Sequence, residues 1–182
     1  DKYLSLSSVM PLLGYGSRLH NNSEVPSSYY FNLATWHTIN LAYTKKIWVQ
    51  LADVCRDASE QDKMGRLQKL IDERAGHWLA MKVEEGKIAL SDAAEVQLEL
   101  ERLSPAQSLL LKRTQFDDAI GHLCGSVEET VLRLLRDAGV APEAVDTVFF
   151  TGGSSGVRLL REKIAALVPA ARKVEGDLFG SI

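Results

Sequence analysis

One stretch near the C-terminal end limits the possible folds more than any other. Residues 145–156 read VDTVFFTGGSSG, so an apolar, β-rich run passes directly into a turn of glycines and serines. Apolar residues then recur at helical spacing, at Val157, Leu160, Ile164 and Leu167. This order predicts a strand, a glycine turn and a helix. Such a turn is typical of nucleotide sites, because glycine lets a ligand approach the backbone and the first helical amides face it.

The same turn allows a second interpretation. Residues 152–156 satisfy G-x-S-x-G, the nucleophile elbow of serine hydrolases, which would make Ser154 the nucleophile. In that fold an acid and then a histidine follow the serine. All four histidines of the chain precede Ser154, at positions 20, 37, 77 and 122. A serine hydrolase is therefore the least favoured interpretation.

Two motifs together resemble a known family. The pattern Asp-x-Val-x-x-x-Gly-Gly-Ser-Ser over residues 146–155 resembles the adenosine-binding signature of the actin-like ATPase superfamily, in its DnaK-like heat-shock chaperone form. Upstream, residues 84–91 read EEGKIALS and resemble the family's Glu-x-x-Lys-x-x-Leu-Ser segment, which packs on the other side of the nucleoside. The two motifs follow the family's order and spacing over roughly residues 80–182. Residues 9–16 and 175–181 resemble its bacterial YegD-like branch more closely.

The resemblance implies a fold and a nucleotide site. It implies an α/β (α+β) fold, the second lobe of such an ATPase domain. A mainly helical subdomain with a small antiparallel β-hairpin would occupy residues 1–113, and an α/β subdomain residues 114–182. The nucleotide would be ATP or ADP, with Mg²⁺ in the intact protein. The residues that would contact it are Gly152, Gly153, Ser154, Gly156, Glu84, Lys87, Ile88, Ser91 and Asp177.

The resemblance also assigns roles to these residues. The amides around Gly152 and Gly153 would line the ribose and the phosphates, and the Ser154 hydroxyl would reach the base. Further contacts would come from Glu84 and Lys87 to the ribose hydroxyls, from Ser91 to the adenine edge and from Asp177 near the purine. From the residues alone, simpler explanations stay open. Glu84 and Lys87 are also spaced as an i,i+3 ion pair on a helix, and the glycines also fit an ordinary turn that needs positive φ.

Two positions depart from the family pattern. Typical members place an arginine directly after the segment's lysine and another two residues after the turn's serine, and these arginines sandwich the adenine. Here the two positions hold Ile88 and Gly156. Since each cation–π contact is worth ~0.5–2 kcal/mol, losing both would weaken adenine binding by about one to three decades. We expect nucleotide recognition to be altered in strength or in base preference.

Catalytic elements are missing from the sequence. Neither the superfamily's Asp-x-Gly hairpins, which hold phosphate and Mg²⁺, nor a P-loop occurs in it. We therefore assign no catalytic residue and no metal ligand, and expect ATPase activity only in the intact protein. Two other functions remain open: a non-catalytic actin-like interaction module, favoured by Ile88 and Gly156, and a sugar or metabolite kinase of the same superfamily. The chaperone-like wording of residues 84–91 argues against the kinase.

Composition narrows the partners. The 182 residues are 46% hydrophobic and 25% charged with a net charge of −3, which is typical of a soluble globular protein and gives no reason to expect nucleic acid. No apolar run reaches the ~20 residues of a membrane span. Cys55 and Cys124 fall on apolar helical faces and predict buried free thiols in a reducing compartment, hence a cytoplasmic location. The expected partners are the nucleotide and client or co-chaperone proteins. The chain opens at Asp1 as if cut from a longer protein.

The remaining pattern is mostly helical. Apolar spacing predicts one helix from Thr35 to Val54, a second carrying Met64 through Trp78, and their packing as a hairpin. Residues 94–101 alternate strictly and predict a strand, with residues 108–112 returning beside it. Thr114 is expected to cap a long helix that ends at Gly139 and buries Leu123, Val127 and Leu134. We expect Trp36, Trp48 and Trp78 to be core or helix-contact residues.

Overall fold

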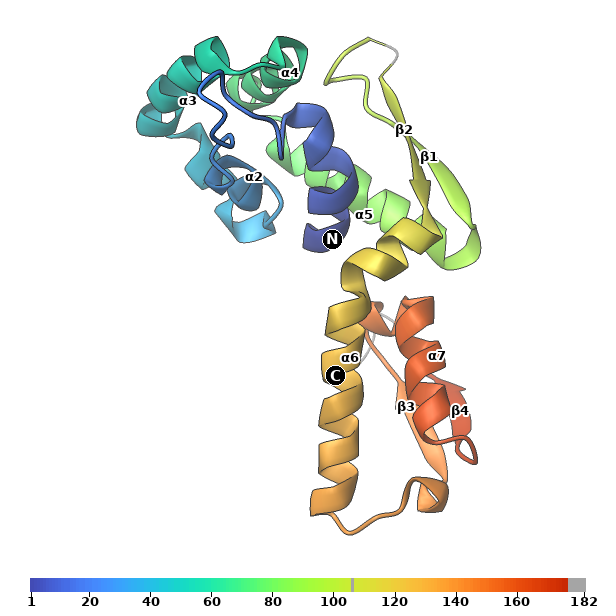
Figure 1. The fold of residues 1–182 in the computed structure, drawn as a ribbon. Helices are drawn as coiled ribbons and strands as arrows, with labels where there is room; N and C mark the ends of the chain where they lie inside the picture. The colour runs from blue at the N-terminus through green and yellow to red at the C-terminus, as the bar shows by residue number, and fades with distance from the viewer. Residues whose placement is uncertain (106, 177–182) are drawn as a thin grey trace. The chain divides into compact units, whose positions relative to one another are not determined.

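The computed structural model describes residues 1–105 and 107–176. The chain divides into two compact units, Asp1–Ala119 and Ile120–Ile182, and the boundary falls inside the long helix α6 (Arg113–Asp137). Each unit is described by itself below. Figure 1 gives the labels of the helices and strands.

Helices make up most of the first unit. The chain opens with three short, continuous helical segments of α, π and 3₁₀ type, which end at Leu13. Longer helices follow after a loop. In chain order, the helical segments of this unit are α1 (Lys2–Leu4), η1 (Ser5–Val9), η2 (Met10–Leu13), α2 (Ser28–Leu33), η3 (Trp36–Tyr43), α3 (Lys45–Asp57), α4 (Gln61–Asp72) and α5 (Gly76–Asp92).

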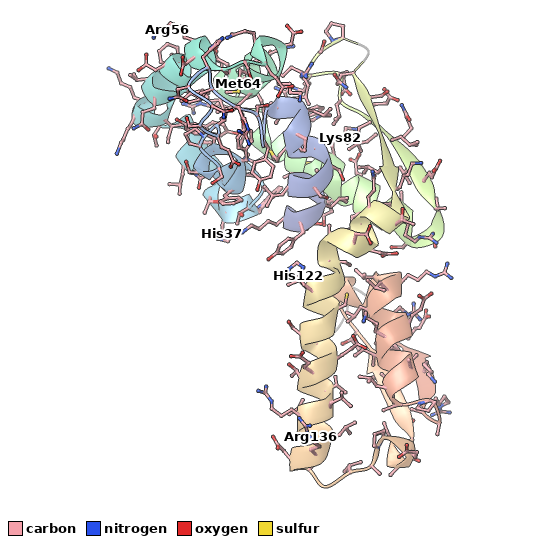
Figure 2. The ribbon with its side chains drawn as sticks, viewed as in Figure 1. His37, Arg56, Met64, Lys82, His122 and Arg136 are labelled. Carbon is pink, nitrogen blue, oxygen red and sulfur yellow. The ribbon has the colours of Figure 1, made fainter. Side chains whose placement is uncertain are left out.

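The core of this unit draws side chains from both ends of its sequence. Tyr30 of α2 is fully buried, and its hydroxyl donates a hydrogen bond to the carbonyl of Leu13 at 3.1 Å. The same hydroxyl lies 3.8 Å from the sulfur of Met64 in α4, which Figure 2 shows among the helices. Cys55 packs nearby, where burial raises the pKa of its thiol. Cys124 of the second unit is also buried, and neither cysteine forms a disulfide, as the sequence predicted.

The expected single helix over residues 35–54 is wrong. It divides into the 3₁₀ segment η3 and the α-helix α3, because Thr44 between them is extended, with φ −72° and ψ 146°. The Thr44 hydroxyl accepts a hydrogen bond from the amide of Ile47 at 3.4 Å, so this residue caps α3. Apolar spacing runs on through a cap, and this explains why periodicity joined the two segments.

The second expected helix is also divided. Arg74 has φ +49° and ends α4, and α5 begins at Gly76. A Cβ at Gly76 would lie 2.6 Å from the Tyr43 hydroxyl and 2.7 Å from Cγ2 of Ile39, so only glycine fits without a shift. Met64 and Trp78, expected on one helix, therefore belong to α4 and α5. The predicted hairpin of the residue 35–54 helix with the next one is found in a shorter form, because α3 contacts α4.

The tryptophans are contact residues of the surface. Trp36 is 56% exposed and Trp48 47% exposed, so of the two expected roles, core or helix contact, these two residues have the second. Each still joins two elements. Trp48 of α3 donates its indole N–H to Asp72 of α4 at 2.6 Å, and Trp36 packs its ring edge-on against His77 of α5 at 4.9 Å. Trp78 of α5 lies under the Arg102 guanidinium, 5.4 Å from its ring centre.

A two-stranded antiparallel sheet completes the first unit. Strand β1 (Glu95–Glu99) pairs with β2 (Ser108–Lys112), with Val96 opposite Leu111 and Leu98 opposite Leu109. These four apolar residues share one face, as the alternation in the sequence predicted. The face packs on α5 at Gly86, where a Cβ would lie 2.7 Å from Cδ1 of Leu111.

The second unit is a small α/β layer. Strand β3 (Thr147–Phe150) pairs in parallel with β4 (Arg172–Glu175), and α7 (Arg158–Leu167) connects them. The helices α6 and α7 are joined by an ion pair between Glu128 and Lys163. The order of elements between α6 and α7 is η4 (Pro142–Ala144), β3 and η5 (Gly153–Gly156). This arrangement, with the helical first unit and its hairpin, confirms the predicted mixed fold.

Two details of α6 differ from expectation. The helix begins at Arg113, so Thr114 lies in its first turn instead of capping it. Phe116, Ile120 and Cys124 are buried, whereas three residues expected on the same buried face are 39% to 59% exposed: Leu123, Val127 and Leu134. The helix ends as predicted, because Gly139 has φ +66° just beyond it.

Candidate functional site

The glycine turn follows β3 directly and has the shape that the sequence predicted. Gly152 has φ +78° and ψ 160°, a backbone conformation that is essentially restricted to glycine. Residues 153–156 then form one 3₁₀ turn before α7 begins at Arg158. The amides of Gly153 and Ser154 open this turn, where N–H groups have no acceptor within the helix. The turn therefore offers backbone donors to a ligand.

Space around the turn is open. A Cβ at Gly152, Gly153 or Gly156 would meet no atom of residues 1–105 and 107–176 within 4 Å. These glycines are therefore not required by packing inside this unit. Gly176, just after β4, contrasts with them, because a Cβ there would lie 2.9 Å from Cγ2 of Thr151. The requirement for glycine at 152 comes from its φ, and positions 153 and 156 are free of local constraint.

Ser155 holds the turn from inside. Its side chain is buried, and its hydroxyl donates a hydrogen bond to the Gly152 carbonyl at 2.7 Å. Its own amide donates to the same oxygen at 3.0 Å. Ser154, the residue assigned to the base, is exposed. Sequence reasoning missed Ser155, although a serine three residues after a turn carbonyl is a known local bonding pattern.

The second group of predicted residues lies along one face of α5. Glu84, Ile88 and Ser91 follow one another at helical spacing and are exposed, with Ile88 55% exposed. Met81, one turn earlier, extends this face and is 51% exposed. We call residues 81, 84, 88 and 91 the open face of α5. Ile88 near its centre offers an exposed apolar contact.

The other side of α5 is fixed by packing. Val83 and Leu90 are buried, and Gly86 makes room for the β1–β2 sheet. At the helix end, the Arg113 side chain donates from Nε to the Leu90 carbonyl at 2.8 Å. Packing on one side therefore orients the open face toward the surface.

Lys87 does not form the ion pair with Glu84 that the sequence left open. Its Nζ lies 2.7 Å from Oδ1 of Asp1, and the lysine side chain is only 23% exposed. Lys82, on the same helix, forms an i,i+3 pair with Glu85 at 3.3 Å. Glu84 is therefore exposed beside a lysine that already has a partner.

The predicted residues are divided between the units. The open face of α5 belongs to the first unit and the glycine turn to the second, so the structure shows each half separately. Asp177, the remaining predicted contact, lies outside the described residues.

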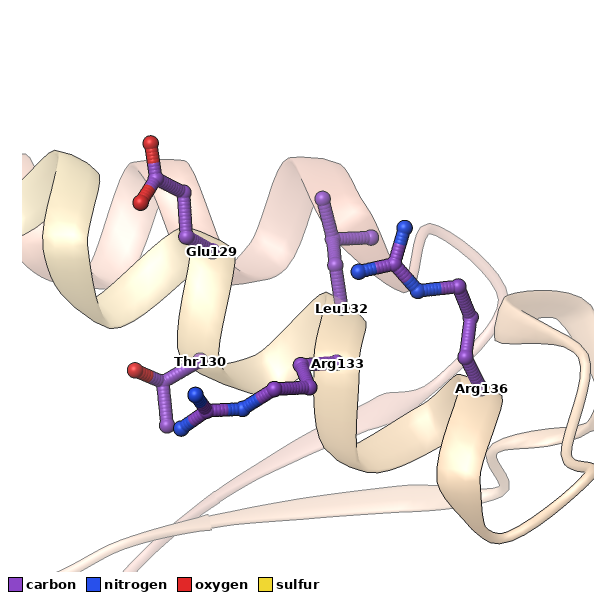
Figure 3. A pocket seen from close by; sticks show the side chains of 5 residues that line it. All are labelled: Glu129, Thr130, Leu132, Arg133 and Arg136. Atoms are coloured by element: carbon purple, nitrogen blue, oxygen red, sulfur yellow. The ribbon is translucent and has the colours of Figure 1, made fainter.

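Two surface hollows of the described residues do not involve these positions. One of about 380 Å³ is lined by five side chains of α6, shown in Figure 3: Glu129, Thr130, Leu132, Arg133 and Arg136. Another of about 310 Å³ involves Trp48, Asp72 and Arg74. Neither is lined by a predicted site residue.

In residues 1–105 and 107–176 no cluster of acidic, His or Cys side chains could hold a metal ion. Over the same residues no helix combines the length and apolarity needed to cross a membrane.

The chain combines a strand–glycine turn–helix unit with a helical unit that carries a small hairpin, which places it among proteins of mixed helix and sheet with a nucleotide-type turn. The family model for Hsp70 protein matches residues 50–177, which include both predicted motifs. The chain belongs to the Hsp70 family.

Individual relatives agree with this assignment. The chain is 37% identical over 79 residues to the chaperone protein HscA homolog of Delftia acidovorans, over 43% of this chain and 13% of that protein. It is 41% identical over 81 residues to the chaperone protein HscA of Salmonella newport, over 43% of this chain and 12% of that protein. The chaperone protein dnaK3 of Synechocystis shares 25% identity over 103 residues, 53% of this chain. The match thus spans about one eighth of the length of the two HscA proteins.

Proposed function

We propose that this chain is a nucleotide-binding part of a heat-shock-chaperone ATPase. The turn at residues 152–154 and the open face of α5 would each contact ATP or ADP. The observation that carries this proposal is the turn itself, in which Gly152 takes a glycine-only conformation and a Cβ at Gly152 or Gly153 would meet no atom of the described residues within 4 Å. The family match supports it, since it covers both segments.

Each segment contributes a different chemistry. The Gly152–Gly153 backbone would donate hydrogen bonds to ribose and phosphate oxygens, and the exposed Ser154 hydroxyl would bond the base. On α5, Glu84 would accept from a ribose hydroxyl. Lys87 would donate to one only by sharing its charge with Asp1, to which it is already paired. Ser91 and Asp177 would complete the contacts to the purine.

Base recognition is the unusual part of this proposal. Ile88, at the centre of the open face, would pack on the ring where family members use an arginine, and Gly156 leaves the second arginine position empty. Hydrophobic contact replaces cation–π attraction. We propose a weaker or less base-selective nucleotide site than in typical members of the family.

The reaction belongs to the whole protein. When bound in the intact protein, ATP with Mg²⁺ supplies the phosphate that is hydrolysed, and phosphoryl transfer depends on holding phosphate, metal and water together. This chain would position the nucleoside end, and we assign no catalytic residue to it. Client or co-chaperone proteins as partners, and a cytoplasmic location, are part of the same proposal.

One observation favours a second candidate. With Ile88 and Gly156 in place of the two arginines, the lobe could have given up useful nucleotide affinity and act through protein contacts. A non-catalytic interaction module of this kind would keep the fold and lose the ligand.

Calorimetric titration of the full-length protein with ATP and Mg²⁺ decides between the two. We expect micromolar or tighter binding, abolished in Gly153→Asp because the new carboxylate repels the phosphates. The Gly153 position is open, so this variant should keep its fold. Gly65→Asp on α4, where a Cβ also meets open space, adds the same charge far along the chain and should bind like wild type. If the wild type does not bind, the interaction module becomes the better candidate.

A further inference from the structure

Ser155 has a buried polar side chain in the second unit, and its hydroxyl is directed back into the turn. It is 8% exposed, and both of its donors, the hydroxyl and the amide, bond the Gly152 carbonyl at 2.7 and 3.0 Å. A backbone amide would form this second bond with any residue at 155. The hydroxyl bond requires serine or threonine.

The hydrogen bond from Ser155 restrains Gly152, and glycine has more backbone freedom than any other residue type. Gly152 has no Cβ, so nothing in its own structure selects φ +78° and ψ 160° from the many conformations open to glycine. In the part of the chain that the structure describes, no packing atom restrains Gly152 or Gly153 either, because a Cβ at each would meet nothing there within 4 Å. Hydrogen bonds to the Gly152 carbonyl are therefore the local restraint on the direction of the amides that follow.

We propose that Ser155 is a positioning residue of the nucleotide site, which fixes the Gly152 carbonyl and thereby aims the Gly153 and Ser154 amides at the ligand. This inference rests on the proposed function, since it assigns a cause to the geometry of that site. Ser155 itself, being buried, does not touch the nucleotide. Its effect on binding passes through the backbone of the turn.

The experiment separates the hydroxyl from the shape of the side chain. Ser155→Thr keeps the donor, and Ser155→Val has nearly the shape of threonine without it. Ser155→Ala removes the donor without adding volume. ATP affinity of the full-length protein is measured by calorimetry, and thermal unfolding of each variant is followed by circular dichroism. Ser126→Ala is the matched control, because Ser126 donates to a backbone carbonyl at 3.1 Å on exposed α6, outside the site.

We expect ATP binding to weaken about three- to tenfold in Ser155→Ala and Ser155→Val, the equivalent of one net hydrogen bond. Ser155→Thr should bind within about twofold of wild type, and Ser126→Ala should be unchanged. Because threonine and valine have the same volume, a packing defect would lower both equally. A difference between them reports the donor, even if Ser155→Ala is too unstable to study.

Two results overturn the inference, and they can be told apart. If wild type binds ATP and Ser155→Val binds as well as Ser155→Thr, the site is real and Ser155 does not position it. If wild type does not bind ATP at all, the proposed function fails and this inference fails with it.

Discussion

Gly152 and Gly153 are adjacent in the chain, but the backbone conformation requires glycine only at position 152. Gly152 has φ +78°, which a side chain makes unfavourable whatever the surrounding space. Gly153 has neither positive φ nor a close neighbour, so inside this chain it tolerates a side chain. Only approach of a ligand would require glycine at 153. Substitution at Gly152 should therefore affect the stability of the fold, whereas substitution at Gly153 should affect ligand binding alone.

We predict that Gly152→Ala lowers the free energy of unfolding by about 1–3 kcal/mol, the usual cost of a side chain in a disfavoured backbone region. Gly153→Ala should change it by less than about 0.5 kcal/mol, as at other unconstrained surface positions. Urea denaturation of both variants, followed by circular dichroism, measures the difference. Equal effects at the two positions would contradict the conformational explanation.

Restoring the two arginines tests the base-binding part of the proposal. Ile88 is 55% exposed and Gly156 has open space, so Ile88→Arg and Gly156→Arg should both be accommodated. We predict that the double variant binds ATP about one to three decades more tightly, because each cation–π contact contributes ~0.5–2 kcal/mol. Ile88→Lys with Gly156→Lys supplies the same charge without the planar group and should gain less. Unchanged affinity would place the base elsewhere.

At the scale of single residues, the sequence predicts features that depend on neighbours along the chain. The turn, its positive φ and the helical location of Glu84 through Ser91 follow from spacing and glycine placement. The ion pair of Lys87 with Asp1 could not be predicted, because it joins residues 86 positions apart that no pattern connects. The role of each predicted site residue toward a nucleotide stays a prediction.

At the scale of the elements, the glycines of α4 and α5 differ in whether packing requires them. Gly76 opens α5 in contact with Tyr43 and Ile39, and its amide donates to the Tyr43 hydroxyl at 2.8 Å. Gly65 lies inside α4 with no neighbour within 4 Å of a Cβ. The first glycine is required by packing, and the second only lowers helix propensity.

The same substitution should therefore have opposite signs at the two positions. We predict that Gly76→Ala destabilises the protein by about 1–3 kcal/mol through overpacking. Gly65→Ala should stabilise it by up to about 1 kcal/mol, the difference in helix propensity. Thermal unfolding of the pair measures both. Stabilisation by Gly76→Ala would mean that Tyr43 can move aside without cost.

The start of α4 should make stability depend on pH. Glu60 accepts from Lys63 at 2.6 Å and from the buried Ser17 hydroxyl, and these bonds lower the pKa of its carboxyl. A lowered folded pKa gives stability that is present above the ordinary glutamate pKa of about 4.3 and lost as pH falls below it. We predict that the stability advantage of wild type over Glu60→Gln shrinks between about pH 5 and 3. A difference independent of pH would contradict this.

Element types were predicted better than their boundaries. The strands of the hairpin, the long α6 and the α5 segment follow from periodicity. The breaks at Thr44 and Arg74 could not be predicted from periodicity, because both interrupt helices without interrupting the apolar pattern. The exposed part of α6 was also missed, since spacing identifies an apolar stripe without showing what covers it.

At the scale of the whole chain, the family match and the fold do not begin at the same place. The match starts at residue 50, yet residues before it supply fully buried side chains, including Leu4, Tyr30 and Ile39. The Arg66 side chain of α4 also donates from Nε to the Leu12 carbonyl at 2.8 Å. The first 49 residues therefore belong to the core of the first unit, although family comparison does not reach them.

We predict that a chain starting at residue 50 loses the cooperative unfolding transition of the first unit, because Tyr30 and its neighbours no longer cover Met64. The exposed apolar surface should bind the dye ANS. Calorimetry and dye fluorescence measure the two effects. A sharp transition in the shortened chain would show that the family-matched residues fold without this cover.

The division of subdomains between residues 113 and 114 stays a prediction.

The placement of the tryptophans has a practical consequence. Trp78 is part of α5, and Trp36 rests edge-on against His77 of the same helix, whereas Trp48 is hydrogen-bonded within the α3–α4 pair. Indole emission shifts with the polarity and mobility around the ring. The helix that carries Glu84, Ile88 and Ser91 thus contains Trp78 and contacts Trp36 through His77, whereas Trp48 can serve as an internal reference. Ligand binding at the open face can therefore be followed as a shift in the wavelength of tryptophan emission, without a label.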